Sequence, residues 1–176
     1  MPGYLLDTNV VSETRRLRPN AGVIDFISKA DQNALFLSVL LEAIVEWAEK
    51  RSLFGVALVG SHARGQAGPD SDIDLTILVG DPEPFRADLA WLAEIDWDRA
   101  HVRPMAHRDM SYGVVWSRHV ELEGGPEVEF SFAAASWAQT EPVDPGTRQV
   151  VRNGYRVLYD PHGILAALHA AIENGN

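Results

Sequence analysis

Residues 58–79, LVGSHARGQAGPDSDIDLTILV, decide the fold of this chain. The apolar stretch 55–59 has the composition of a buried strand, and it ends at the dipeptide Gly60-Ser61. A connection rich in Gly, Pro and Asp follows, and a second apolar stretch begins at Ile73 and runs to residue 79. The segment therefore predicts two buried strands joined by a polar, glycine-rich loop.

The polar residues of this segment point to phosphate and metal binding. Glycine at position 60 lets a phosphate approach the backbone closely, and the Ser61 hydroxyl can hydrogen-bond a phosphate oxygen. Asp72 and Asp74 are two residues apart, so on a strand they share one face while Ile73 points into the core. Two carboxylates on one face favour cation binding, and Mg²⁺ prefers such oxygen ligands.

A third carboxylate is expected on a neighbouring strand, because a two-metal site needs a bridging and a flanking ligand. In PEVEFSF, residues 126–132, strand alternation separates an apolar face from a polar face that carries Glu127, Glu129 and Ser131. Glu129 lies at the centre of the predicted strand and is the candidate, with Glu127 as the alternative.

Gly60-Ser61, ten intervening residues and Asp72-x-Asp74 resemble the signature of the polymerase-beta nucleotidyltransferase superfamily. The neighbouring residues His62-Ala63-Arg64-Gly65 are similar to those of its small bacterial members. The resemblance runs from about residue 40 to residue 171, and EVEFSFAAASWA followed by TEPVDPGTRQVVRNGYRVLYDP resembles the tail of the same group. It implies an α/β (α+β) fold, a mixed sheet flanked by helices, in a nucleotidyltransferase domain over residues 40–176.

The same resemblance implies that a nucleoside monophosphate, here AMP from ATP, is transferred to a hydroxyl group. One metal would lower the pKa of that hydroxyl while the other holds the triphosphate. The expected catalytic residues and ligands of Mg²⁺ or Mn²⁺ are Asp72, Asp74 and Glu129. The expected nucleotide-binding residues are Gly60, Ser61 and Arg64, the last through its planar guanidinium.

The identity of the acceptor stays open at this stage. One reading is a protein-modifying enzyme that resembles the minimal nucleotidyltransferase antitoxins, which attach AMP to a partner toxin. The alternative is a small-molecule enzyme of the aminoglycoside nucleotidyltransferase type. A core of about 135 residues without an extra substrate domain favours the first reading. A regulatory module with a silent active site is a further alternative.

The N-terminal segment has a different character. Residues 3–39 resemble the opening of a PIN-domain toxin ribonuclease, whose first metal ligand would fall on Asp7. The pattern predicts a βαβ-like fragment with strands over residues 4–11 and 35–39 and a helix over residues 23–29. A single aspartate cannot hold a catalytic magnesium, so residues 1–39 are interpreted as a truncated PIN-like segment, with an active PIN-type ribonuclease as the alternative function.

Composition narrows the partners. The chain has no cysteine, which excludes disulfides and thiolate metal sites and favours the cytoplasm. A formal net charge of −10 disfavours long nucleic acid as a partner, although a nucleotide carried with a divalent ion remains compatible. No apolar stretch approaches the roughly 20 residues of a spanning helix, so a soluble protein without a membrane partner is expected.

Further elements are predicted along the chain. Trp116 and Trp137 are expected in the core, with stacking on a substrate as the alternative. The six histidines show no metal-ligand spacing. The remaining predicted elements are a helix after residue 40, a helix over 84–95, strands over 114–122 and 127–132, a helix capped by Asp144-Pro145, a strand over 155–159 and a last helix capped by Asp160-Pro161.

Overall fold

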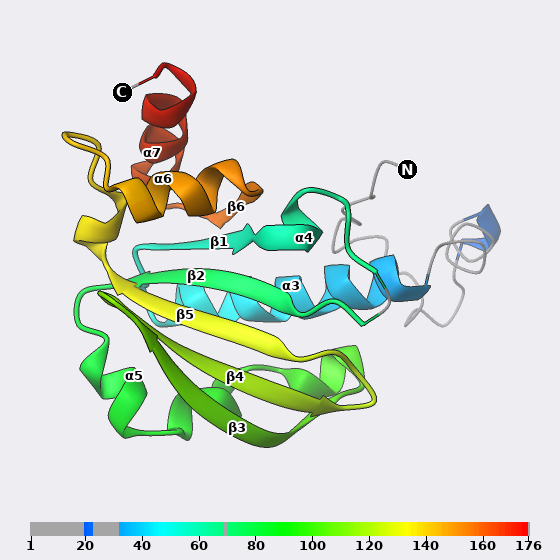
Figure 1. The fold of residues 1–176 in the computed structure, drawn as a ribbon. Coiled ribbons are helices and arrows are strands. Elements are labelled where there is room, and N and C mark those ends of the chain that lie inside the picture. The colour runs from blue at the N-terminus through cyan, green and yellow to red at the C-terminus, as the bar shows by residue number, and fades with distance from the viewer. Residues whose placement is uncertain (1–19, 23–31, 69, 176) are drawn as a thin grey trace.

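A mixed sheet of six strands, in the order β3-β4-β5-β2-β1-β6, organises the computed structural model, which describes residues 20–22, 32–68 and 70–175 (Figure 1). Neighbouring strands are antiparallel except β2 and β5, which are parallel. The strands are β1 (Gly55–Val59), β2 (Ile73–Val79), β3 (Arg103–Tyr112), β4 (Val115–Glu123), β5 (Val128–Ala134) and β6 (Tyr155–Tyr159). The predicted α/β (α+β) class with helices around a mixed sheet is confirmed.

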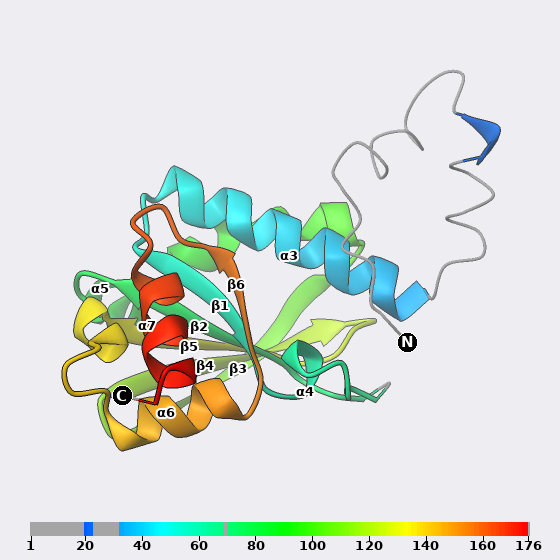
Figure 2. The same cartoon turned by 90° about the horizontal axis from the view of Figure 1, so that it is seen from above.

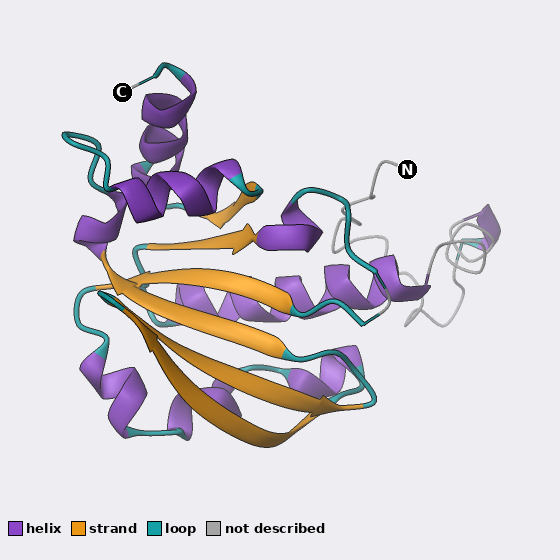
Figure 3. Ribbon diagram, viewed as in Figure 1, coloured by secondary structure: helices purple, strands orange, loops and turns teal. Residues whose placement is uncertain are grey.

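Helices lie on both faces of the sheet. Figure 2 shows α3 on one side of the strands and α6 with α7 on the other, and Figure 3 separates the helices and strands by colour. On the first side are α3 (Gln32–Lys50), α5 (Glu83–Ala87), η1 (Ala90–Glu94) and η2 (Trp97–Ala100). On the second side are η3 (Ala135–Ala138), α6 (Pro145–Arg152) and α7 (Ile164–Glu173), and the short α4 (Gly60–Ala63) follows β1.

Strand alternation divides the core between the two faces. On β2, Ile73 and Leu75 pack into the cluster that contains α3, while Leu78 packs into the cluster that contains α7. On β5, Phe130 and Phe132 pack on the α3 side, where both rings contact the Trp91 ring at centroid distances of 5.1 Å. The residues of β2 and β5 that alternate with these apolar ones therefore face the second side of the sheet. The polar side chains of both strands lie there.

The structure corrects the sequence-based prediction in the segment before β1. Residues 35–39 were expected as a strand, but they lie within α3. A short apolar run has no periodicity of its own, and here it continues the helical spacing of the residues that follow, with Val39, Leu40 and Ala43 all buried. A βαβ unit ending at residue 39 is therefore wrong, and the predicted domain boundary after residue 39 falls inside α3. Residues 3–19 of the PIN-like segment, including Asp7, and residues 23–31 lie outside the described residues.

Two further predictions need correction, and one strand was not predicted. The helix expected over residues 84–95 is divided into α5 and η1, because Asp88 has an extended backbone and its carboxylate accepts the N–H of Ala90. The last helix begins at Ile164 rather than after Pro161, although Asp160 still accepts the N–H of Ala166. Strand β3 was not predicted, since all ten of its residues are exposed and it has no apolar alternation.

The predicted strands over residues 55–59, 73–79 and 155–159 are confirmed, as is the hairpin that joins β4 to β5. Asp144 caps α6 as predicted, accepting the N–H of Thr147. Within the part of the chain that the structure describes, no helix combines the length and apolar character needed to cross a membrane.

Candidate active site

Asp74 and Glu129 are direct neighbours across the parallel strands β2 and β5. Their Cα atoms are paired in the strand register, so both side chains project from the same face of the sheet. The same row continues to His119 on β4 and to Val59 on β1. The sheet thus brings two of the three predicted carboxylates side by side. Asp72 lies two residues before Asp74, ahead of the first residue of β2, and is exposed.

Gly60 lies against the Asp74 carboxylate. Its φ of +69° belongs to the left-handed region that favours glycine, and a Cβ at this position would lie 2.4 Å from Asp74 Oδ2. Position 60 therefore has to be glycine for two reasons, backbone conformation and the space that Asp74 occupies. Ser61 is the next residue, half-buried in α4.

A chain of hydroxyl groups holds Glu129. The Ser131 hydroxyl donates to Glu129 Oε1 at 2.9 Å, and the Ser117 hydroxyl lies 2.7 Å from that of Ser131. Ser131 therefore accepts from Ser117 while it donates to Glu129. This arrangement fixes one oxygen of the carboxylate and leaves Oε2 without a hydrogen bond to another described residue.

The alternative carboxylate, Glu127, has partners of its own. It forms a bidentate ion pair with Arg108, and the His119 Nδ1 atom lies 2.8 Å from its Oε1. The hydrogen bond from Arg108 is the main cause of a lowered pKa at Glu127. Its charge is therefore already neutralised by neighbouring donors. Of the two candidates, Glu129 faces Asp74 and Glu127 faces Arg108 and His119.

His119 was missed by sequence reasoning. Its side chain is 7% exposed, and because an ionised carboxylate can only accept, its Nδ1–H donates to Glu127. Its Nε2 atom is buried without a hydrogen-bond partner and lies 3.9 Å from Glu129 Oε1. Histidine spacing along the chain gave no signal, since strand pairing rather than sequence distance places His119 in this row.

Arg64 connects α4 to the end of α6. Its guanidinium donates to the backbone oxygen of Asn153 and, at 3.1 Å, to Gln66 Oε1. The absence of a side chain at Gly154 leaves room for this contact, because a Cβ there would lie 2.5 Å from Arg64 Cγ and 2.6 Å from the Gly60 oxygen. Arg64 thus lies beside the candidate site, and its Nε and Nη1 atoms donate to protein acceptors.

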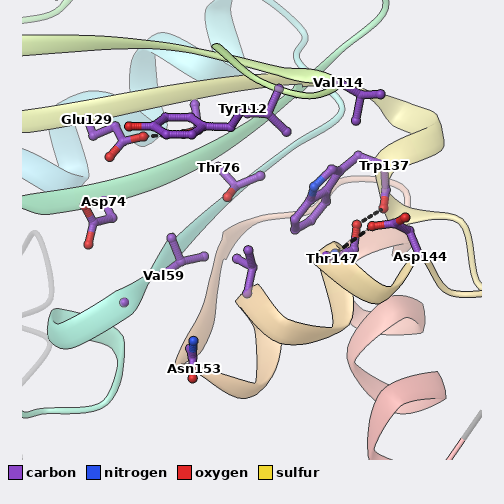
Figure 4. A pocket seen from close by; sticks show the side chains of 15 residues that line it. Val59, Asp74, Thr76, Tyr112, Val114, Glu129, Trp137, Asp144, Thr147 and Asn153 are labelled. Carbon is purple, nitrogen blue, oxygen red and sulfur yellow. Dashed lines mark hydrogen bonds between the residues drawn. The ribbon is translucent and has the colours of Figure 1, made fainter. Parts of the chain in front are cut away.

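A pocket of about 510 Å³ opens beside the paired carboxylates (Figure 4). In this view Asp74 and Glu129 lie on one side, and Trp137, Val114 and Thr147 lie on the other. Gly60 also lines the pocket, as do Thr76 and Ser131 on the sheet. Trp137 was expected in the core, and it is indeed buried while one side of it contributes to the pocket wall.

Comparison with known proteins agrees with this geometry. The family model described as the nucleotidyltransferase domain matches residues 40–109. Over these residues the chain is similar to the nucleotidyltransferase domain. It is an enzyme that transfers a phosphorus-containing group. The matched residues include Gly60 and Asp74, and they end before the strand that carries Glu129.

Two other comparisons add no functional detail. No curated protein matched this chain. A solved structure described as "Crystal structure of the toxin-antitoxin with AMP-PNP" has a TM-score of 0.40 and 14% sequence identity, covering 76% of this chain and 84% of that chain. A likeness at this level carries no argument about the ligands or partners of this chain.

The electrostatics of the domain are dominated by negative charge. The pKa of Asp74 is raised from 3.8 to about 6, first by burial and then by the charges of Glu129 and Asp72. Within residues 32–68 and 70–175, no group of three or more His, Cys, Asp or Glu side chains is arranged to hold a metal ion. The structure therefore pairs Asp74 with Glu129 but does not gather all three predicted carboxylates around one point.

This pKa shift has a consequence for metal-free stability. Folded protein binds a proton on Asp74 more tightly than unfolded protein does, so Asp74 should lower stability as pH rises from about 4 to about 6. Asp74→Asn removes this effect. We expect the metal-free variant to gain about 1 to 2 kcal/mol over the wild type at pH 8, after allowance for partial exposure, and nothing at pH 4. Urea unfolding at both pH values measures it, and a variant that is less stable at pH 8 would contradict the repulsion.

Proposed function

We propose that this protein transfers AMP from ATP to a hydroxyl group, with a divalent cation held by Asp74 and Glu129 and assisted by Asp72. The observation that carries the proposal is the pairing of Asp74 with Glu129 across β2 and β5, beside Gly60. The family match to residues 40–109 supports the reaction class.

The donor set fits Mg²⁺ or Mn²⁺. Asp74 and Glu129 offer carboxylate oxygens, which these hard cations prefer. Magnesium sites in phosphoryl-transfer enzymes commonly use one or two carboxylates and complete their coordination with substrate phosphates and water. Two paired carboxylates therefore suffice before the nucleotide binds, and a cation would relieve the repulsion that raises the pKa of Asp74. The bound cations would supply charge neutralisation on the triphosphate and a lowered pKa at the acceptor hydroxyl.

Each proposed residue has a distinct task. Glu129 has one oxygen fixed by Ser131, and its Oε2 is the proposed acceptor for the proton of the attacking hydroxyl. Gly60 leaves the space in which the Asp74 carboxylate lies. The Ser61 hydroxyl is proposed to donate to a phosphate oxygen. Arg64 is proposed to supply positive charge to the triphosphate, for which its guanidinium would exchange the Asn153 oxygen for phosphate.

For the acceptor we propose a hydroxyl of a partner protein, in the manner of an antitoxin that adds AMP to a toxin. The pocket rim supports this choice. Tyr112 and Val114, at the end of the β3–β4 hairpin, are 51% and 84% exposed, so a large acceptor can reach this edge of the pocket. An aminoglycoside hydroxyl is the competing acceptor.

Labelled ATP distinguishes these outcomes. In an incubation with Mg²⁺ and candidate toxin proteins, we expect label on the α-phosphate to appear on a toxin protein. Label on the γ-phosphate should be released in pyrophosphate. A parallel reaction with aminoglycosides tests the competing acceptor. Transfer of the γ-label instead would indicate a kinase and overturn the proposal.

A further inference from the structure

The pocket beside Asp74 has a charged end and an apolar end. Its volume of about 510 Å³ lies within the usual range for small-molecule sites, roughly 300 to 1,000 Å³. A cation with a phosphate chain would occupy the end that contains Asp74 and Glu129. The apolar side chains that line the pocket are Val59, Tyr112, Val114, Val115, Trp137 and Val150.

One wall of the apolar end is built into the core. Trp137 is 8% exposed and belongs to the buried cluster that includes Val151 and Leu165. The Thr147 hydroxyl donates to the Trp137 backbone oxygen at 3.3 Å, and Asp144 caps the same turn by accepting the Thr147 N–H. The junction of η3 and α6 therefore holds the indole ring in a fixed place.

The other wall is exposed. Tyr112 ends β3 and Val114 lies in the turn before β4, and both are among the most exposed large hydrophobic residues in the described part of the chain. The Tyr112 hydroxyl donates only to the Met110 sulfur, a weak acceptor, at 3.3 Å. Exposed apolar side chains beside a pocket are typical of a ligand-binding surface. Tyr112 and Trp137 both contribute aromatic surface to the pocket lining, which suits a flat ligand.

We propose that the apolar end binds the nucleobase of the nucleotide, with Tyr112 and Val114 as contact residues and Trp137 as the fixed wall. This inference rests on the proposed function, because the charged end then orients the triphosphate and directs the base away from the carboxylates. The side chain of Asn153, which also lines the pocket, can both donate to and accept from the edge of a base.

Comparison of ATP with inorganic tripolyphosphate isolates the contribution of the nucleoside to the affinity. Both ligands present a triphosphate, but only ATP has a base and a sugar. In Mg²⁺, we expect calorimetry to show that the wild type binds ATP more tightly than tripolyphosphate. The double variant Tyr112→Ala/Val114→Ala should lose about tenfold or more in ATP affinity and keep its tripolyphosphate affinity, as expected for the loss of a stacking contact.

Two control variants define the interpretation. Tyr112→Phe keeps the ring and should bind ATP like the wild type. Val157→Ala removes another exposed hydrophobic side chain, on β6 and outside the pocket, and should change neither affinity. An unchanged ratio of ATP to tripolyphosphate affinity in the double variant would overturn this inference alone. Failure of both ligands to bind in Mg²⁺ would overturn the proposed function and the inference with it.

Discussion

Asp74→Asn is expected to reduce AMP transfer by about 10³-fold or more while the protein stays folded. The substitution removes the charge of a proposed metal ligand and hardly changes its volume. Stabilisation of transition-state charge by a metal is worth several kcal/mol, and each 1.36 kcal/mol corresponds to a tenfold change in rate. Because Asp74 lies in register with Glu129, its loss leaves a single carboxylate at the centre of the site.

Asp70→Asn is the matched control, since it removes the same charge from the exposed loop before β2. Asp70 lies in a turn and is exposed, so its variant should transfer AMP at nearly the wild-type rate. The measurement is the initial rate of α-label transfer from ATP under single-turnover conditions. An Asp74→Asn enzyme within threefold of the wild-type rate would remove Asp74 from the active site.

The second large effect concerns Glu129→Gln, which should cost about 10²-fold in transfer rate without loss of metal-free stability. The glutamine oxygen can still accept from Ser131, so the local structure is retained. The variant loses a proposed metal ligand and proton acceptor, which explains the rate. It also loses the repulsion between Glu129 and Asp74, so the melting temperature should stay equal or rise.

Glu127→Gln should affect stability more, and the transfer rate less, than Glu129→Gln does. Glu127 is paired with Arg108 and His119, so its substitution should lower the melting temperature and have a smaller effect on the transfer rate. Measuring both quantities for both variants assigns the third carboxylate. Full activity in Glu129→Gln together with inactivity in Glu127→Gln would move that role to Glu127.

The sequence was sufficient where local pattern determines structure. The apolar runs of β1, β2 and β5 identified these strands, and alternation placed Ile73 and Phe130 in the core. The same alternation put Asp74 and Glu129 on the polar faces of their strands. It did not indicate that β5 pairs directly with β2, because that pairing joins strands far apart in the sequence.

Other features could not be obtained from local pattern. Strand β3 is exposed along its whole length, so it has no hydrophobic periodicity, and its pairing with β4 alone defines it. The pairing of β4 with β5 brings His119 to Glu127, and the β3–β4 hairpin places Tyr112 beside the pocket. Residues 35–39 were assigned to the wrong element because a five-residue apolar run fits both a strand and a helix.

Asp74 and Glu129 are proposed to hold a divalent cation without which the triphosphate cannot bind. The two carboxylates alone repel phosphate, in a protein whose formal net charge is −10. The most direct measurement is calorimetric titration of metal-free protein with ATP, once with Mg²⁺ and once with a chelator. We expect binding with Mg²⁺ and none with the chelator, and equal affinity under the two conditions would contradict the proposed cation site.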